Sequence, residues 1–260
     1  MYVVDKTGHG DKLTGVSRVD VQVASGLGRP PLLPLIHTLD EVVLSPAVIS
    51  DAEIPSLNHL DSLGYGVETV KKVFSILRQA MLSRRYESVS PDSIRIILNH
   101  ADHAILNHLH DECTSVDVYQ FKVLIMATHV FIYAILRQLP PNGPLVGVLL
   151  TRLGDELSNK LSNIDVWGDH LSVLLWALYV GASVSSKRIG GKSAWFSARL
   201  RHVVQQLHLR TKLEVEECLQ TFLWTEAYFR EFLDEWWEDA GDLSPDPTVS
   251  GIASESTRGN

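Results

Sequence analysis

The sequence predicts an all-α protein, a single multi-helix domain of packed antiparallel helices. Apolar residues recur at helical spacing in successive segments from Val67 onward, and turn residues separate these segments. No convincing pair of strands occurs anywhere in the chain. We therefore expect three parts: a loose leader over residues 1–34, an all-helical domain over residues 35–240 and a disordered tail with acidic residues, serine and proline over residues 241–260.

Length and composition limit the function classes. The chain has 260 residues, a mass of 29.0 kDa and 45% hydrophobic residues, which is enough for a substantial core. Its formal net charge of -8 disfavours DNA binding by this chain alone, because neutralising many phosphates requires a basic surplus. Cys113 and Cys218 are too few for a disulfide framework or a multi-cysteine zinc site, which favours a reducing intracellular compartment. The acidic N-terminal residues indicate neither a secretory signal nor a transit peptide.

The glycine-rich leader is the least regular part of the sequence. The alternation of Val19, Val21 and Val23 is compatible with one short strand, which would lack a partner. From Leu35 to Gly66, prolines and a glycine interrupt the apolar residues, and this pattern predicts short helical turns packed on the domain.

Four helices are expected in the first half of the domain. Ser90 followed by Pro91 is a typical N-cap and first-turn pair, so it marks the start of the second helix. The proline-rich segment Pro140–Pro144 ends the third, long helix in a tight turn. The expected apolar faces run over Val67–Met81, Ile94–Leu109, Val118–Leu139 and Leu145–Leu161.

The rest of the domain is organised around the stretch Asp169–Leu200. Its first helix is apolar on almost every side from Leu171 to Val180, as expected of a helix enclosed by others. The uncharged run barely reaches membrane-spanning length and its second half is small and polar, so we expect no membrane span. Small residues there allow a neighbouring helix to approach closely.

Two further helices complete the expected domain. One has Phe196, Leu200 and Val204 at helical spacing. Thr211–Glu214 is typical of a capping box, which predicts that one last long helix starts here, continues through Phe222 and Leu223 and ends near Gly241.

Several of these segments together resemble a known family. They are Leu174–Gly181 with the pattern Leu-Leu-Trp-Ala-Leu-Tyr-Val-Gly, the pair Trp195–Phe196, Phe222–Trp224 and Trp236–Asp239, preceded by Phe131–Tyr133 and Leu136–Pro141. Their order and spacing resemble the fungal-specific transcription factor domain, the C-terminal part of the middle homology region of fungal zinc-cluster transcription factors. The likeness covers about residues 118–239.

The resemblance implies a transcription-regulatory helical domain that acts through protein interaction or effector response. Those factors also carry an N-terminal cluster of six cysteines that binds zinc and reads DNA, whereas this chain has two cysteines, so direct DNA binding is not expected from this chain alone. The chain is then a regulator without its DNA-binding domain, a partner of another regulator, or the product of a truncated gene model. The implied location is the nucleus, or otherwise the cytoplasm.

The partners implied are other transcription regulators or co-regulator proteins, with a homo- or heterodimer and a small effector bound between helices as further options. We expect no enzyme activity, no cofactor and no membrane association. No residue is assigned a catalytic, cofactor-binding or metal-binding role.

An alternative is an all-helical metal-dependent hydrolase using the segment His100–Asp111. His100, His103 and His110 can share a stripe of one helix, and His110–Asp111 is a dipeptide found in metal-dependent phosphohydrolases. Those enzymes need ligands that converge from several helices, so a solvated polar face explains the histidines more simply.

A second candidate is the segment Arg188–Ser193, which resembles the end of a phosphate-binding loop. Its required first glycine is replaced by Ser186, and the preceding segment is helical rather than a strand. A flexible helix connector is the favoured interpretation.

Charge is also unevenly distributed. Residues 187–212 contain only basic charged residues, whereas Arg230 is the only base among the many acids of residues 214–242. We expect the basic helix to pack against the acidic one. The alternatives are a basic face for an acidic partner and an activation-type segment built on Trp224, Trp236 and Trp237 among carboxylates.

Overall fold

The computed structural model describes residues 19–52, 61, 66–86, 89–109, 116–160, 164–189 and 193–240, and in this part of the chain it is all helical, without strands. The predicted all-α class is confirmed. The predicted tail over 241–260 lies outside the described residues. The elements in chain order are η1 (Leu39–Glu41), α2 (Pro46–Ala52), α3 (Val67–Arg85), α4 (Pro91–His108), α5 (Val116–Val130), η3 (Phe131–Leu136), α6 (Pro144–Lys160), η4 (Ile164–His170), α7 (Leu171–Ser186), α8 (Ser193–Gln206), α9 (Lys212–Gln220) and α10 (Glu226–Ala240).

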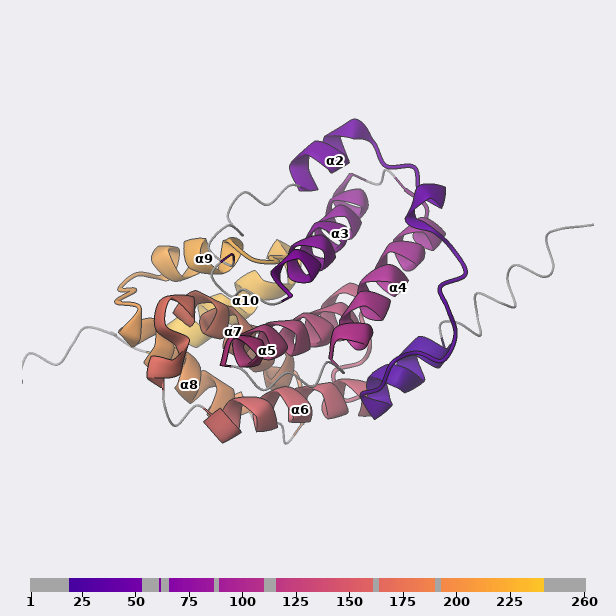
Figure 1. Ribbon diagram of the computed structural model, residues 1–260. Helices are drawn as coiled ribbons and strands as arrows, with labels where there is room; N and C mark the ends of the chain where they lie inside the picture. The colour runs from indigo at the N-terminus through magenta and orange to yellow at the C-terminus, as the bar shows by residue number, and fades with distance from the viewer. Residues whose placement is uncertain are drawn as a thin grey trace, which may run out of the picture.

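Helix α7 is the core of the domain, as its uniformly apolar sequence predicts. Every residue from Val173 to Ser185 is buried. Figure 1 shows α7 and α5 at the centre, with the other helices around them, and α7 packs against both α5 and α8. At Gly181, an added Cβ atom would lie 2.3 Å from Cε1 of Phe196 on α8, so only glycine permits this close approach.

Two predicted helix starts are confirmed by their hydrogen bonds. The Ser90 hydroxyl accepts from the backbone N–H of Ser93 at 3.1 Å, and Pro91 occupies the first helical turn of α4. At α9, Thr211 and Glu214 form the reciprocal bonds of a capping box. The backbone N–H groups of Arg210 and Thr211 lower the pKa of Glu214.

The third predicted helix is not regular to its end. It changes at Phe131 into the π-helical segment η3, where the Arg137 N–H donates to the Ile132 carbonyl at 2.7 Å, five residues back. All six side chains of η3 are buried, and Gln138 follows with φ of 52° before the prolines. The wider turn distributes buried side chains over more directions than an α-helix would, which periodicity alone does not reveal.

The prediction of one last long helix is wrong. The chain leaves the helix after Gln220 and re-enters it at Glu226, so α9 and α10 form a hairpin. The connecting residues Phe222 and Leu223 are buried because they fill the core between the two helices.

The leader also differs from the prediction where it is described. Residues 19–27 form a helix rather than a strand, with Val21, Ala24 and Ser25 buried at helical spacing. Figure 1 shows this indigo helix beside one end of α6. Arg152 of α6 donates to the carbonyls of Ser25 and Gly26 at 2.7 and 2.6 Å, which satisfies the helix end. Residues 1–18 lie outside the described part.

One stretch, Tyr119–Leu136, is long and apolar enough to cross a membrane. It comprises most of α5 and all of η3, and 89% of it is buried inside the protein. This degree of burial is typical of the core helix of a globular protein.

Candidate functional site

A pocket of about 1090 Å³ lies where three segments meet: the end of α3, the segment from η3 to the proline turn, and the α9–α10 connection. Its volume is slightly above the range of about 300–1,000 Å³ that is usual for small-molecule sites. The apolar part of its lining consists of Met81, Leu82, Ala134, Ile135, Leu136, Leu139, Pro140, Pro141, Phe222, Leu223, Trp224, Ala227 and Tyr228.

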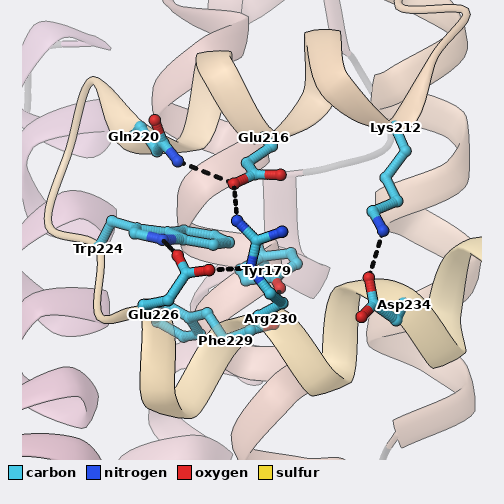
Figure 2. A network of polar contacts seen from close by, with 9 residues as sticks. All are labelled: Tyr179, Lys212, Glu216, Gln220, Trp224, Glu226, Phe229, Arg230 and Asp234. Carbon is cyan, nitrogen blue, oxygen red and sulfur yellow. Dashed lines mark hydrogen bonds and ion pairs between the residues drawn. The ribbon is translucent and has the colours of Figure 1, made fainter.

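A network of polar contacts joins α9 and α10, as Figure 2 shows, and residues of this network line the pocket. Arg230 of α10 reaches across to Glu216 of α9 at 2.6 Å and also pairs with Glu226, one turn earlier on α10. Glu216 accepts a further bond from Gln220 at 2.9 Å. Lys212 and Asp234 form a second link between the two helices. The hairpin is therefore clamped at both ends.

Trp224 forms part of the pocket wall and is held in place. Its indole N–H donates to Glu226 at 3.0 Å, and its ring stacks on Tyr179 of α7 with a centroid distance of 6.0 Å. Glu226 is the only acidic side chain among the described lining residues, and Arg230 and Trp224 both bind its carboxylate. The negative charge of Glu226 is therefore compensated within the protein.

Three arginines of α3 line the opposite side: Arg78, Arg84 and Arg85. Arg78 donates to the backbone carbonyl of Asp51 at 2.9 Å. Within the described residues, Arg84 and Arg85 form no hydrogen bond or ion pair with an acidic side chain. Burial, and then repulsion from Arg137, lower the pKa of Arg84, although an arginine stays charged at neutral pH.

The helix dipole accounts for only part of this charge. The C-terminus of a helix carries roughly half a negative charge, which favours basic residues in its last turn. Arg84 and Arg85 both occupy the last turn of α3, so their two positive charges exceed the half negative charge of the helix end. The described lining of the pocket therefore has a surplus of positive charge beside an apolar wall.

A second site-like feature, the polar cluster, is buried between the N-terminal helix, α4, α5 and η3. It consists of Ser25, Asp102, His129, Tyr133 and Arg137. The Ser25 oxygen lies 3.0 Å from His129 Nε2 and 3.0 Å from the Tyr133 hydroxyl. Arg137 donates to Asp102 at 2.5 Å and to Asn99 at 2.8 Å. The two bonds of Ser25 join segments that are more than 100 residues apart in the sequence.

The cluster has the residue types of a Ser-His-Asp triad but a different geometry. The Ser25 hydroxyl donates its only hydrogen to the Val21 carbonyl at 2.7 Å, so it accepts from His129 Nε2–H. A nucleophilic serine needs the opposite polarity. Asp102 lies 3.7 Å from that same Nε2 atom rather than from Nδ1. Burial lowers the pKa of His129 to about 4, so its ring is neutral at pH 7. The arrangement is suited to anchoring the N-terminal helix and not to acyl transfer.

The histidines of the metal-site alternative make other contacts where they are described. His100 Nε2 donates to the His37 carbonyl at 2.8 Å and His103 Nε2 to the Leu33 carbonyl at 3.0 Å. His108 Nε2 lies 3.0 Å from the Thr69 hydroxyl. His110 and Asp111 lie outside the described residues. In the described ranges, no group of three or more His, Cys, Asp or Glu side chains is placed to hold a metal ion.

The segment that resembles a phosphate-binding loop contacts the proline turn. Arg188 donates to the carbonyls of Pro141 and Gly143, and the Ile189 N–H donates to Asn142 at 3.1 Å. Residues 190–192 lie outside the described part. Lys187 lies 4.0 Å above the Tyr228 ring, which adds a fourth positive charge close to the pocket lining.

The basic and acidic segments do meet, though through few contacts. Arg201 of α8 donates to the Asp239 carbonyl of α10 at 2.9 Å, and Lys212 pairs with Asp234. Cys218 is a free, half-buried thiol, and burial raises its pKa to about 11, so it is a poor nucleophile at neutral pH.

Comparisons of the chain with protein-family models, with curated proteins and with solved structures each found no match. Neither the arginine-lined pocket nor the polar cluster is predicted by the sequence. The basic end Arg84–Arg85 of the first amphipathic helix was the only signal for the pocket. The polar cluster had no local signal, because its members come from three separate segments of the sequence: the N-terminal helix, α4, and the continuous stretch of α5 and η3.

Proposed function

We propose that this chain is a transcription-regulatory helical domain of the fungal transcription factor type, which acts through protein interaction and responds to a small effector. It is not itself a zinc-cluster DNA reader, and it works with other transcription regulators or co-regulator proteins in the nucleus.

The observation that carries the proposal is that three of the family-like segments meet in one unit, the aromatic cluster (Phe74, Phe131, Trp176, Tyr179, Phe222, Trp224 and Phe229), which Phe74 of α3 and Phe229 of α10 complete. Trp176 of the Leu174–Gly181 segment donates to the Leu223 carbonyl at 3.1 Å and stacks on Phe222 at 5.7 Å. Tyr179 stacks on Trp224, and Phe196 packs on Gly181. Segments that are far apart in the sequence thus depend on one another, as expected if they were selected together as a domain.

The test is a reporter assay with the full chain fused to a heterologous DNA-binding domain. We expect the fusion to raise or lower reporter transcription, and the Trp176→Ala variant to lose the effect with the fold. The control Arg199→Gln changes one exposed charge on α8 and should keep the effect. A fusion that is expressed, nuclear and without effect on transcription would overturn the proposal.

The geometry does not favour the metal-dependent hydrolase. Its described histidines are engaged with the segment Leu33–His37 and with Thr69. Metal analysis of the purified protein, followed by His103→Ala and His110→Ala, separates the two functions, since a hydrolase would contain bound metal and lose activity in these variants.

A further inference from the structure

We propose that the pocket between α3, η3 and the α9–α10 connection binds a small amphipathic anion, a carboxylate or phosphate group attached to an apolar body. This inference rests on the proposed function, because the bound molecule would be the effector of the regulatory domain.

The positive charge of the pocket favours an anionic group on the ligand. Arg78, Arg84 and Arg85 line one side, and Lys187 lies on Tyr228 at the other. The carboxylate of Glu226 is bound by Arg230 and Trp224 and so does not neutralise these cations. Arginine binds carboxylate and phosphate groups through paired N–H donors, which gives both affinity and orientation.

The apolar part of the lining favours an apolar body on the ligand. Apolar side chains form most of the described wall, and η3 contributes three of them, Ala134, Ile135 and Leu136. π-Helical turns occur frequently at functional sites, because they displace side chains from the regular helical positions. An inorganic ion would leave this apolar surface uncovered.

The pocket can transmit binding to the rest of the fold. Its η3 wall also carries Tyr133, and Arg137 follows directly, so both pocket and polar cluster share this segment. Its other wall is the hairpin of Figure 2, clamped by Arg230. A ligand that draws Arg84 and Arg85 toward the hairpin would therefore link α3 to α10.

The experiment is isothermal titration of the full chain with 1-naphthoate, with the neutral 1-naphthalenemethanol and with the cationic 1-naphthylmethylamine. Decanoate provides a second anion with a flexible body, and inorganic phosphate tests the anion without an apolar body. We expect naphthoate to bind about tenfold or more tightly than the alcohol, since a charge-assisted bond is lost in the neutral compound. The amine and phosphate should bind more weakly still.

Three variants locate the binding. Arg84→Gln with Arg85→Gln should weaken naphthoate binding about tenfold and leave the alcohol unchanged. Arg199→Gln, which removes one positive charge at an exposed position of α8 outside the pocket lining, should change neither. Ala227→Trp should block both compounds, because Ala227 lines the pocket from an exposed position and its enlargement spares the core. Circular dichroism checks that each variant folds.

Equal affinity for the anion and the alcohol, equal losses in Arg199→Gln, or no binding of any compound would overturn this inference. These outcomes are distinct from failure of the proposed function, which the reporter assay measures without added ligand. If the chain regulates the reporter but binds no naphthoate, the proposed ligand is wrong and the proposed function stands.

Discussion

The aromatic cluster and the polar cluster each include a residue of η3, Phe131 and Tyr133 respectively, yet different forces stabilise them. Phe131 lies against Trp176 and Phe229 with centroid distances of 6.1 and 5.9 Å, in a region that is almost entirely apolar. Tyr133 lies against Ser25 and His129, close to a buried ion pair. Packing forces hardly change with pH, whereas a buried imidazole makes stability depend on it. The stability that the polar cluster contributes should therefore depend on pH, whereas that of the aromatic cluster should not.

The largest effect is expected in the aromatic cluster. Trp176 is completely buried, so Trp176→Ala should lower the free energy of unfolding by about 3–5 kcal/mol. Urea denaturation at pH 7 and pH 5 measures this loss, which should be the same at both values. Trp237→Ala, at a half-buried position of α10, is the control and should cost less. A loss at Trp176 well below this range would indicate a surface group.

The next effect is a pH dependence that arises in the polar cluster. The pKa of His129 is about 4 in the folded protein and about 6.5 in the unfolded chain, because burial disfavours its charged form. The unfolded chain therefore binds a proton first as the pH falls. Stability that is complete above pH 6.5 should decrease toward pH 4, by about 3 kcal/mol in total.

Urea denaturation of wild type and His129→Gln between pH 7 and pH 4 tests this contribution. The variant should lose the part of the pH dependence that belongs to His129. His202→Gln removes an exposed imidazole of α8 and should retain the wild-type profile. Parallel profiles for wild type and His129→Gln would show that this imidazole is not the titrating group.

A smaller effect is expected from the contact that anchors the N-terminal helix. Ser25→Ala removes the acceptor of His129 and Tyr133, and leaving buried polar groups unpaired costs about 1–3 kcal/mol. The matched control is Ser183→Ala, because Ser183 is also completely buried and donates to a carbonyl of its own helix, at 3.1 Å, but has no described bond to another helix. Equal losses in the two variants would mean that the bonds between helices add nothing.

The smallest effect tests packing beside the aromatic cluster. Gly181→Ala places a methyl group against the buried Phe196 ring. The cost of this overpacking should outweigh the gain of about 1 kcal/mol in helix propensity, so the free energy of unfolding should fall by about 1 kcal/mol. At Gly147 the added atom would meet the flexible guanidinium of Arg188, 2.8 Å away, which can move. Thermal denaturation should therefore show a lower melting temperature for Gly181→Ala and an unchanged or higher one for Gly147→Ala.

The sequence by itself determined the helical class and the central helix. Its apolar residues recur at a period that only helices bury efficiently, and the α7 segment is apolar on every side, so it can lie only inside. The N-cap at Ser90 and the capping box at Thr211 also depend only on neighbouring residues, which is why they could be read directly.

Tertiary structure alone decided the helix over residues 19–27, the π-helical turn η3, the break between α9 and α10, and both candidate sites. Each of these depends on contacts between segments remote in the sequence. Ser25 is held by His129 and Tyr133, and Glu216 is held by Arg230. Local periodicity cannot encode such pairs, since the free energy of each contact arises only after the core has brought its two partners together.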